Sequence, residues 1–235
     1  MMKLTEILAR WRGGLIVSCQ APPESPLARP DIIAALALTA EQNGAAGVRI
    51  DAPANIRSVK EIVSVPVLGI EKVKREVADV YITPTYHSAV RIAAAGADVL
   101  ALDGTARARP NGETFAGIIA RVKSELGLPA MADVATYAEG VAAAEEAGAD
   151  FVSTTLAGYT AETVGREGPD FELVERLAAR LRVPIVCEGR LRSPEDVRRA
   201  FDCGAFAVVV GAAITGVDWL VRQYLAATPQ AHARV

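Results

Sequence analysis

Short apolar runs alternate with longer amphipathic stretches along the whole chain. The runs lack polar alternation, which is typical of strands covered on both faces of a parallel sheet. The stretches between them carry apolar residues at helical spacing, for instance over residues 136–147 and 194–203. The pattern predicts eight strands, at residues 14–19, 47–51, 67–72, 98–103, 130–134, 151–155, 185–188 and 207–211.

Glycine and proline mark the points where predicted helices give way to strands. Four alanine-rich stretches end in glycine just before an apolar run, and glycine takes the left-handed conformation that ends a helix at little cost. Proline opens other runs, at the first strand residue, where its missing N–H is tolerated. These joints are Gly47, Gly96, Gly148, Gly204, Pro66, Pro129 and Pro184.

Eight strand–helix units in 235 residues fit an α/β fold of the (β/α)8 or TIM-barrel type. A doubly wound open sheet is the alternative, and it is disfavoured because no Gly-x-Gly-x-x-Gly follows the first strand. We expect a single domain over residues 1–235. We also expect a short amphipathic helix at residues 1–6 and a disordered tail at residues 228–235.

Composition excludes several classes of protein. The chain is 51% hydrophobic with a net charge of −3, and it has no basic stripe with interleaved aromatics, so we expect no nucleic-acid partner. No apolar run approaches the ~20 residues that span a membrane, and the first residues lack the features of a signal peptide. We therefore expect a cytoplasmic protein without a membrane partner.

The cysteines and histidines do not suggest a metal site. Cys19, Cys187 and Cys203 lie in or beside apolar runs without metal-ligand spacing, so we expect them to be small core residues. With only His87 and His232 available, a zinc site built on imidazoles is not expected. We place His87 on a helix face, in a structural role.

Polar side chains gather where the predicted strands end. Barrel strands converge with their C-terminal ends on one pocket, where barrel enzymes carry out their chemistry. Because unpaired buried polar groups cost free energy, so many strand-end polar residues indicate a shared site. They are Ser18, Cys19, Gln20, Arg49, Asp51, Lys72, Asp103, Asp133, Thr154, Thr155 and Glu188.

Lys72, at the end of the third predicted strand, is the leading candidate for a base or nucleophile. A free lysine has a pKa near ~10.4, and burial or a neighbouring cation such as Arg49 would lower it enough for base catalysis. From the residues alone, a structural role for Lys72 is an open alternative to catalysis, in which it forms a buried ion pair with Glu188 or Asp51.

The last two strands carry a different signal. Gly189 and Arg190 follow the seventh strand, and Gly211 and Ala212 follow the eighth and enter a short helix. Small residues let backbone N–H groups approach an anion, and barrel proteins commonly bind phosphate at this point. Tight turns alone would also explain the glycines.

Several segments appear in an order that resembles the N-acetylmannosamine-6-phosphate 2-epimerase family. The resemblance extends over nearly the whole chain, from about Ser18 to Thr215. The segments are Ser18-Cys19-Gln20-Ala21, Gly69-Ile70-Glu71-Lys72, Tyr81-Ile82-Thr83-Pro84-Thr85, Leu102-Asp103-Gly104-Thr105-Ala106-Arg107-Ala108-Arg109-Pro110, Met131-Ala132-Asp133-Val134, Thr155-Leu156-Ala157-Gly158-Tyr159-Thr160 and Glu188-Gly189-Arg190.

The resemblance implies a (β/α)8 barrel of sialic-acid catabolism that interconverts N-acetylmannosamine 6-phosphate and N-acetylglucosamine 6-phosphate. It implies no cofactor, a small-molecule amino-sugar phosphate as the partner, and a homodimer. It matches Lys72 to the catalytic lysine and Glu188 to the assisting carboxylate. The other implied roles are sugar binding by Gln20, Arg49 and Asp133, and phosphate binding by Gly189, Arg190, Gly211 and Ala212. Tyr159 and Thr160, past the sixth strand, could close over the sugar.

Two positions depart from the family pattern. Glu71 stands where the family usually has an apolar residue. Gly216 follows Ala213-Ile214-Thr215, where the family tends to carry an arginine near the phosphate. Either another cation supplies that charge, with Arg190 the nearest in sequence, or affinity is weaker, or the ligand differs.

Other interpretations stay open from the residues alone. Lys72 could form a Schiff base in an aldolase-type barrel, or the protein could be a non-catalytic sugar-phosphate sensor. Arg107 and Arg109 could steer an anionic substrate, although pairing with Asp103 and Glu113 is favoured. Apolar Val217, Trp219 and Leu220 could form an interface, although packing of the last helix against the core is favoured.

Overall fold

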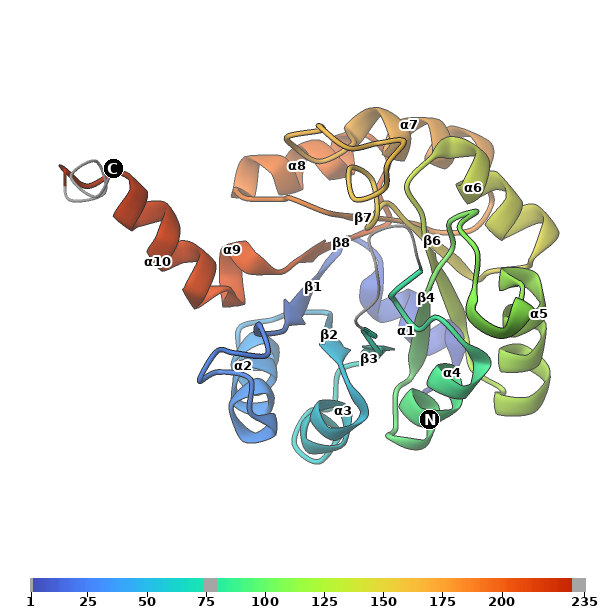
Figure 1. Cartoon of the computed structure of the whole chain (residues 1–235), viewed down its shortest axis with the longest axis horizontal. Coiled ribbons are helices and arrows are strands. Elements are labelled where there is room, and N and C mark those ends of the chain that lie inside the picture. Colours follow the sequence, from blue (N-terminus) through green and yellow to red (C-terminus); the bar gives the residue numbers. More distant parts are fainter. Residues whose placement is uncertain (1, 74–79, 230–235) are drawn as a thin grey trace.

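A closed barrel of eight parallel strands forms the centre of the molecule (Figure 1). The computed structural model describes residues 2–73 and 80–229. Each strand pairs with the next along the chain, and β8 closes the barrel on β1, so the TIM barrel is confirmed and the open sheet is excluded. The strands are β1 (Gly14–Cys19), β2 (Gly47–Asp51), β3 (Val67–Ile70), β4 (Val99–Asp103), β5 (Ala130–Asp133), β6 (Phe151–Ser153), β7 (Ile185–Glu188) and β8 (Ala207–Val210).

Helices surround the barrel and connect successive strands (Figure 1). The predicted helix at residues 136–147 is α6 continued by a π-helical segment, Ala142–Glu146, and the one at residues 194–203 is α8. The helices around and beyond the barrel are α2 (Pro30–Gln42), α3 (Pro53–Lys60), α4 (Tyr86–Ala94), α5 (Phe115–Arg121), α6 (Tyr137–Val141), α7 (Phe171–Arg180), α8 (Pro194–Asp202), α9 (Ala212–Thr215) and α10 (Val217–Ala226).

Five predicted strands differ from the observed ones, each by one or two residues at one end. The largest functional consequence is at β3, which ends at Ile70 and not at Lys72. Beyond Ile70 the backbone N–H of Glu71 donates to Thr83 Oγ1, and Lys72 forms an isolated antiparallel bridge with Ile82. Lys72 therefore lies beyond the end of β3, in a hairpin-like antiparallel pairing of residues 71–73 with residues 81–83, and not within the sheet.

Helix α1 (Leu4–Trp11) packs under the N-terminal ends of the strands, so the prediction of a helix over residues 1–6 is wrong in its bounds. Ile7 and Trp11 are fully buried, and the Trp11 ring lies 5.2 Å from that of Phe151 inside the barrel. The predicted short helix omitted these two core residues, because their spacing of four sets them on one helix face only when the helix continues to Trp11.

Apolar side chains fill both the barrel interior and the space between strands and helices. Cys19 and Cys187 are buried, as predicted, and burial raises the pKa of each thiol to about 12. His87 is exposed on α4, and His232 lies outside the described residues, as does the tail from residue 230. No described helix is long and apolar enough to cross a membrane.

Helix α10 projects away from the barrel (Figure 1). None of its residues is buried, so the expectation that it packs against the core is wrong. Gly216 precedes α10 and packs against the backbone of α9. A Cβ at this position would come within 2.7 Å of the Ala212 backbone. The chain therefore has no room for a side chain at the point where the family tends to carry an arginine.

Candidate active site

A cavity of about 890 Å³ opens at the C-terminal ends of the strands. Most of the predicted strand-end residues line it, including Gln20, Arg49, Asp51, Lys72 and Glu188, together with Gly189, Arg190, Gly211 and Ala212. Among the described residues, Cys19, Asp103, Asp133 and Thr154 do not belong to its lining. Sequence reasoning missed Tyr81, Arg192 and Arg222 as lining residues, since their place in the cavity depends on the course of the loops and of α10.

Lys72 extends into this cavity from the hairpin after β3. Its backbone N–H donates to Asp51 Oδ1 at 2.8 Å, and its Nζ donates to Gln20 Oε1 at 2.5 Å. Gln20 in turn donates to Ser18 Oγ at 2.7 Å, which fixes the amide. Within the described part of the chain Nζ has no ion pair, so the alternative of a salt bridge with Glu188 or Asp51 is wrong.

The environment of Lys72 lowers its pKa from the ordinary value, chiefly because protein atoms around the side chain replace water. Asp51 opposes this shift, and the positive charge of Arg49 adds to it. Solvent reaches Lys72 through the open mouth of the cavity, although protein surrounds it on most other sides. The lowered pKa increases the neutral fraction of the amine, which is the form that can accept a proton.

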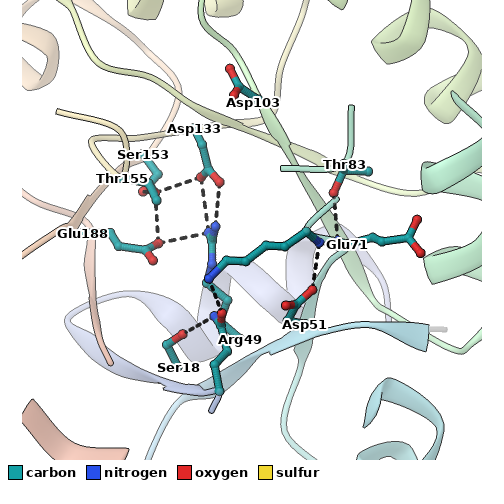
Figure 2. Close-up of polar contacts among 12 residues, drawn as sticks. Ser18, Arg49, Asp51, Glu71, Thr83, Asp103, Asp133, Ser153, Thr155 and Glu188 are labelled. Carbon is teal, nitrogen blue, oxygen red and sulfur yellow. Dashed lines mark hydrogen bonds and ion pairs between the residues drawn. The ribbon is translucent and has the colours of Figure 1, made fainter. Parts of the chain in front are cut away.

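Arg49 on β2 holds two carboxylates, those of Asp133 and Glu188 (Figure 2). Its guanidinium binds Asp133 through two contacts, Nη1–Oδ1 at 3.2 Å and Nη2–Oδ2 at 2.6 Å. Nη1 also lies 2.9 Å from Glu188 Oε2. The Arg49 and Asp133 side chains are 1% and 0% exposed, and that of Glu188 is 13% exposed. Glu188 is therefore the carboxylate of this network that faces the cavity.

Thr155 connects the two carboxylates, because its Oγ1 lies 2.9 Å from Asp133 Oδ1 and 3.0 Å from Glu188 Oε2 (Figure 2). Ser153 Oγ is 2.8 Å away and can donate to it. A threonine hydroxyl has one hydrogen, so it can donate to only one of the two carboxylates. A proton on Glu188 would satisfy the second contact, with Glu188 donating to Thr155.

Burial raises the pKa of Glu188 to about 7, with Asp133 adding to the rise and Arg49 opposing it. The raised pKa favours the protonated form of Glu188 relative to a free carboxyl, in agreement with the hydrogen-bond count at Thr155. A carboxyl of this kind can give up and regain a proton within one catalytic cycle.

We expect the stability of the protein to fall as pH rises from about 5 to 8, in part because of Glu188. Its folded pKa is raised, so its stabilising contribution is complete below the ordinary value of 4.5 and is lost as pH rises through about 7. Between pH 5 and pH 8, Glu188 should change the free energy of unfolding by an amount on the order of 2 kcal/mol, and Glu188→Gln should remove this change. Urea unfolding of both proteins across this range measures it, and equal pH slopes would contradict the assignment.

Asp51 fixes the hairpin that carries Lys72, and we expect Asp51→Asn and Asp51→Ala to behave differently. An asparagine oxygen can still accept the Lys72 N–H, but the negative charge that raises the Lys72 pKa is lost. The acidic limb of kcat/KM should therefore move to lower pH while the plateau stays within about ten-fold. Alanine also removes the anchor, and kcat should fall by about 100-fold. Equal profiles for both variants would show that Asp51 does not position Lys72.

Other predicted residues have structural partners. Arg107 pairs with the buried Asp103 at 2.6 Å, as expected, and Figure 2 shows Asp103 apart from the Arg49 network. Arg109 donates to the carbonyl of Pro84 at 3.2 Å and lies over Phe115, so the expected pairing with Glu113 is not formed in the described structure. Thr154 bonds to the backbone of Glu188 at 3.0 Å and 3.2 Å, which fixes the end of β7.

Glu71 forms an ion pair with Arg91 of α4 at 2.6 Å. This partner explains how a carboxylate is accommodated where the family usually has an apolar residue, because a buried charge is tolerated when it is paired. The pair joins the hairpin of Lys72 to the outer ring of helices. Among the described residues, no group of three His, Cys, Asp or Glu side chains is arranged to hold a metal ion.

The barrel and its strand-end cavity define a (β/α)8-barrel enzyme, and comparisons with known proteins identify its family. A family model described as "Putative N-acetylmannosamine-6-phosphate epimerase" matches residues 33–230. A relative of that description from Synechococcus elongatus is 51% identical over 94% of this chain and 95% of the relative's length. Another, from Cutibacterium acnes, is 48% identical over 89% of this chain and 91% of the relative's length. The chain belongs to the N-acetylmannosamine-6-phosphate epimerase family and is an isomerase.

Solved structures agree with this assignment. The N-acetylmannosamine-6-phosphate 2-epimerase from Clostridium perfringens superposes with a TM-score of 0.90 at 37% identity, covering 96% of this chain and 97% of its own. FabK from Thermotoga maritima, at 15% identity and a TM-score of 0.57 over 91% of this chain and 65% of its own, shares only the fold.

Proposed function

We propose that this enzyme interconverts N-acetylmannosamine 6-phosphate and N-acetylglucosamine 6-phosphate by removing and returning the C2 hydrogen. The observation that carries this proposal is the Lys72 amine, which lies in the strand-end cavity with a lowered pKa and without a carboxylate partner among the described residues. Glu188 lines the same cavity and has a pKa raised to about 7. Membership in the family supports the same substrate pair.

Lys72 is proposed as the base at C2 of the ring-opened sugar. The hydrogen at C2 is acidic because the carbanion spreads onto the aldehyde oxygen as an enolate. C2 is planar in the enolate, so when the enolate turns its opposite face toward Lys72, the Lys72 ammonium returns the proton to that face and inverts the centre. Lys72 accepts the proton as a neutral amine, and the amide of Gln20 holds Nζ at the required place through the 2.5 Å hydrogen bond.

Glu188 is proposed as the proton shuttle. A protonated Glu188 can donate to the sugar oxygen O1 as negative charge develops there, and it recovers the proton when the aldehyde forms again. Arg49 limits the rise in the Glu188 pKa, so that both protonation states are populated near neutral pH. This reaction needs no nicotinamide, because the carbonyl carbon already adjoins the reacting carbon.

The remaining sequence predictions become proposals about binding. Gln20, Arg49 and Tyr159 line the cavity, and we propose that they hold the sugar. Asp133 does not line it, and both its oxygens bind Arg49, so we propose that it acts on the sugar by orienting that guanidinium. Gly189, Gly211 and Ala212 offer close backbone approach to the phosphate, with Arg190 beside them.

A turnover assay tests the proposal. Purified protein is incubated with N-acetylmannosamine 6-phosphate, and proton NMR follows the anomeric signals of the two epimers from either direction. We expect the same equilibrium mixture from both sides. Cleavage products, or trapping of the substrate on Lys72 by borohydride, would instead indicate a Schiff-base lyase, and binding without turnover would indicate a sensor.

We also propose a homodimer that buries the apolar face of α9 and α10. Large apolar side chains are about half exposed or more along these helices: Ile214, Val217, Val221, Tyr224 and Leu225. Light scattering should show a dimer for the native chain and a monomer for the double variant Val221→Glu, Leu225→Glu. A native monomer at all concentrations would contradict this. A place in sialic-acid catabolism, a cytoplasmic location and the absence of a nucleic-acid partner remain predictions.

A further inference from the structure

Arg192 and Arg222 are two of the arginines outside the Arg49 network that line the cavity, together with Gly189, Gly211 and Ala212. Arg192 belongs to the loop after β7, and Arg222 lies on α10. Arg192 lies over the ring of Trp219, 5.6 Å from its centroid, and Trp219 also lines the cavity. Within the described residues neither guanidinium has a hydrogen bond or a carboxylate partner. Both positive charges are therefore available to a ligand.

Arg190, the cation nearest in sequence to the phosphate segment, is already engaged. Its Nη1 donates to the Ala157 carbonyl and its Nη2 to the Gly158 carbonyl, both at 2.8 Å. The guanidinium also lies 4.3 Å from the Tyr159 ring centroid. A Cβ on Gly158 would come within 2.3 Å of Arg190 Nη1, so the two are in close contact. Arg190 thus fastens the loop after β6, and its charge is directed toward carbonyl oxygens.

Position 216 offers no cation, because glycine is required by its contact with Ala212. The backbone of Gly189, Gly211 and Ala212 can donate hydrogen bonds but supplies no full charge. A phosphate monoester carries about −1.5 to −2 charges at pH 7. An anion of that charge in this cavity needs positive side chains from another element.

We propose that Arg192 and Arg222 together bind the phosphate of the substrate and select phosphorylated sugars over unphosphorylated ones. This inference rests on the proposed function, whose substrate is a sugar phosphate. Both arginines line the same cavity as Trp219: Arg192 contacts its ring, and Arg222 lies three residues further along α10. Guanidinium groups suit this task because their paired N–H donors match phosphate oxygens.

Asp218 is the opposing charge at this end of the cavity. It lines the cavity four residues before Arg222, and its Oδ2 accepts a hydrogen bond from Ser25 Oγ at 2.8 Å. It forms no ion pair with Arg222 in the described structure. Its carboxylate should weaken phosphate binding and leave the pair of arginines with a net positive charge.

Calorimetric titration with N-acetylglucosamine 6-phosphate, inorganic phosphate and unphosphorylated N-acetylglucosamine tests this proposal. Arg192→Gln and Arg222→Gln should each weaken binding of the phosphorylated sugar about ten-fold, and the double variant about 100-fold. Binding of the unphosphorylated sugar should change less than about two-fold. Asp218→Asn should strengthen binding of both phosphate ligands several-fold, and this gain should shrink at high salt.

Arg182→Gln is the matched control, since Arg182 precedes β7 at the other end of the barrel and does not line the cavity. Its affinities should equal those of the native protein. If the double variant binds the phosphorylated sugar within about two-fold of the native affinity, the proposal is wrong. This outcome is independent of turnover: a native protein without epimerase activity would refute the proposed function, whereas the arginine effect on phosphate affinity would still stand.

Discussion

Replacing Lys72 with methionine is expected to lower kcat for epimerisation by about a thousand-fold or more. General acid–base catalysis contributes typically about 10²–10⁴-fold, and in this cavity Lys72 is the proposed base at C2. Methionine keeps the length and apolar stem of lysine but cannot accept a proton. Initial rates measured by proton NMR, with substrate at saturating concentration, give the comparison.

A measurement of substrate affinity distinguishes loss of the catalytic base from loss of the substrate-binding site. The Lys72→Met variant should bind N-acetylglucosamine 6-phosphate within about ten-fold of the native affinity, because the Arg49 network and the phosphate end do not depend on Nζ. Lys123→Met, which removes an ion pair with Asp150 at the periphery, is the matched control and should keep native kcat. Native turnover by Lys72→Met would exclude Lys72 as the base.

Replacing Arg49 with methionine is expected to destabilise the protein by about 3–5 kcal/mol. The change leaves Asp133 and Glu188 buried without the guanidinium that holds both, through contacts of 2.6 Å and 2.9 Å. In a protein of this size the loss corresponds to a fall in Tm of roughly 10 °C. Activity should also be lost, because Arg49 orients Glu188.

The pH dependence of the stability of Arg49→Met shows whether unpaired charge causes the loss. Without Arg49 the pKa of Glu188 should rise further, because the guanidinium is the main group that opposes its rise. The stability deficit should therefore shrink as pH falls from 8 to 5, where the carboxylates bind protons. Arg121→Met removes an exposed pair with Glu125 and should cost less than about 1 kcal/mol. A deficit that is constant with pH would show that lost packing, and not unpaired charge, destabilises the variant.

The barrel could be predicted from the sequence because parallel strands covered on both faces appear as short apolar runs. Strand ends were less certain: β3 stops at Ile70 because the Thr83 hydroxyl takes the next N–H, a partner twelve residues away. The course of α10 could not be predicted either. Its apolar residues favoured core packing, whereas the contact of Gly216 with Ala212 accompanies a turn away from the barrel.

The convergence of strand-end residues was also predictable, but their pairing was not. Side chains alternate between the two faces of a strand, so one residue along β5 decides whether Asp133 meets Arg49 or the outer helices. The sequence likewise suggested Arg190 as the spare phosphate cation. Its guanidinium turns instead to the carbonyls of Ala157 and Gly158, from a backbone with φ of 58° at Arg190. A left-handed conformation at a residue other than glycine is uncommon and cannot be predicted from the sequence.

Hydrogen exchange at C2 tests the proposed mechanism most directly. N-acetylmannosamine 6-phosphate is incubated in deuterated water with native protein or with Lys72→Met, and the C2 proton signal is followed by NMR. Removal of this hydrogen by Lys72 predicts loss of the signal and deuterium at C2 of both epimers with the native protein, and a retained signal with the variant. Full exchange in Lys72→Met, or conversion by the native protein without deuterium at C2, would contradict the mechanism.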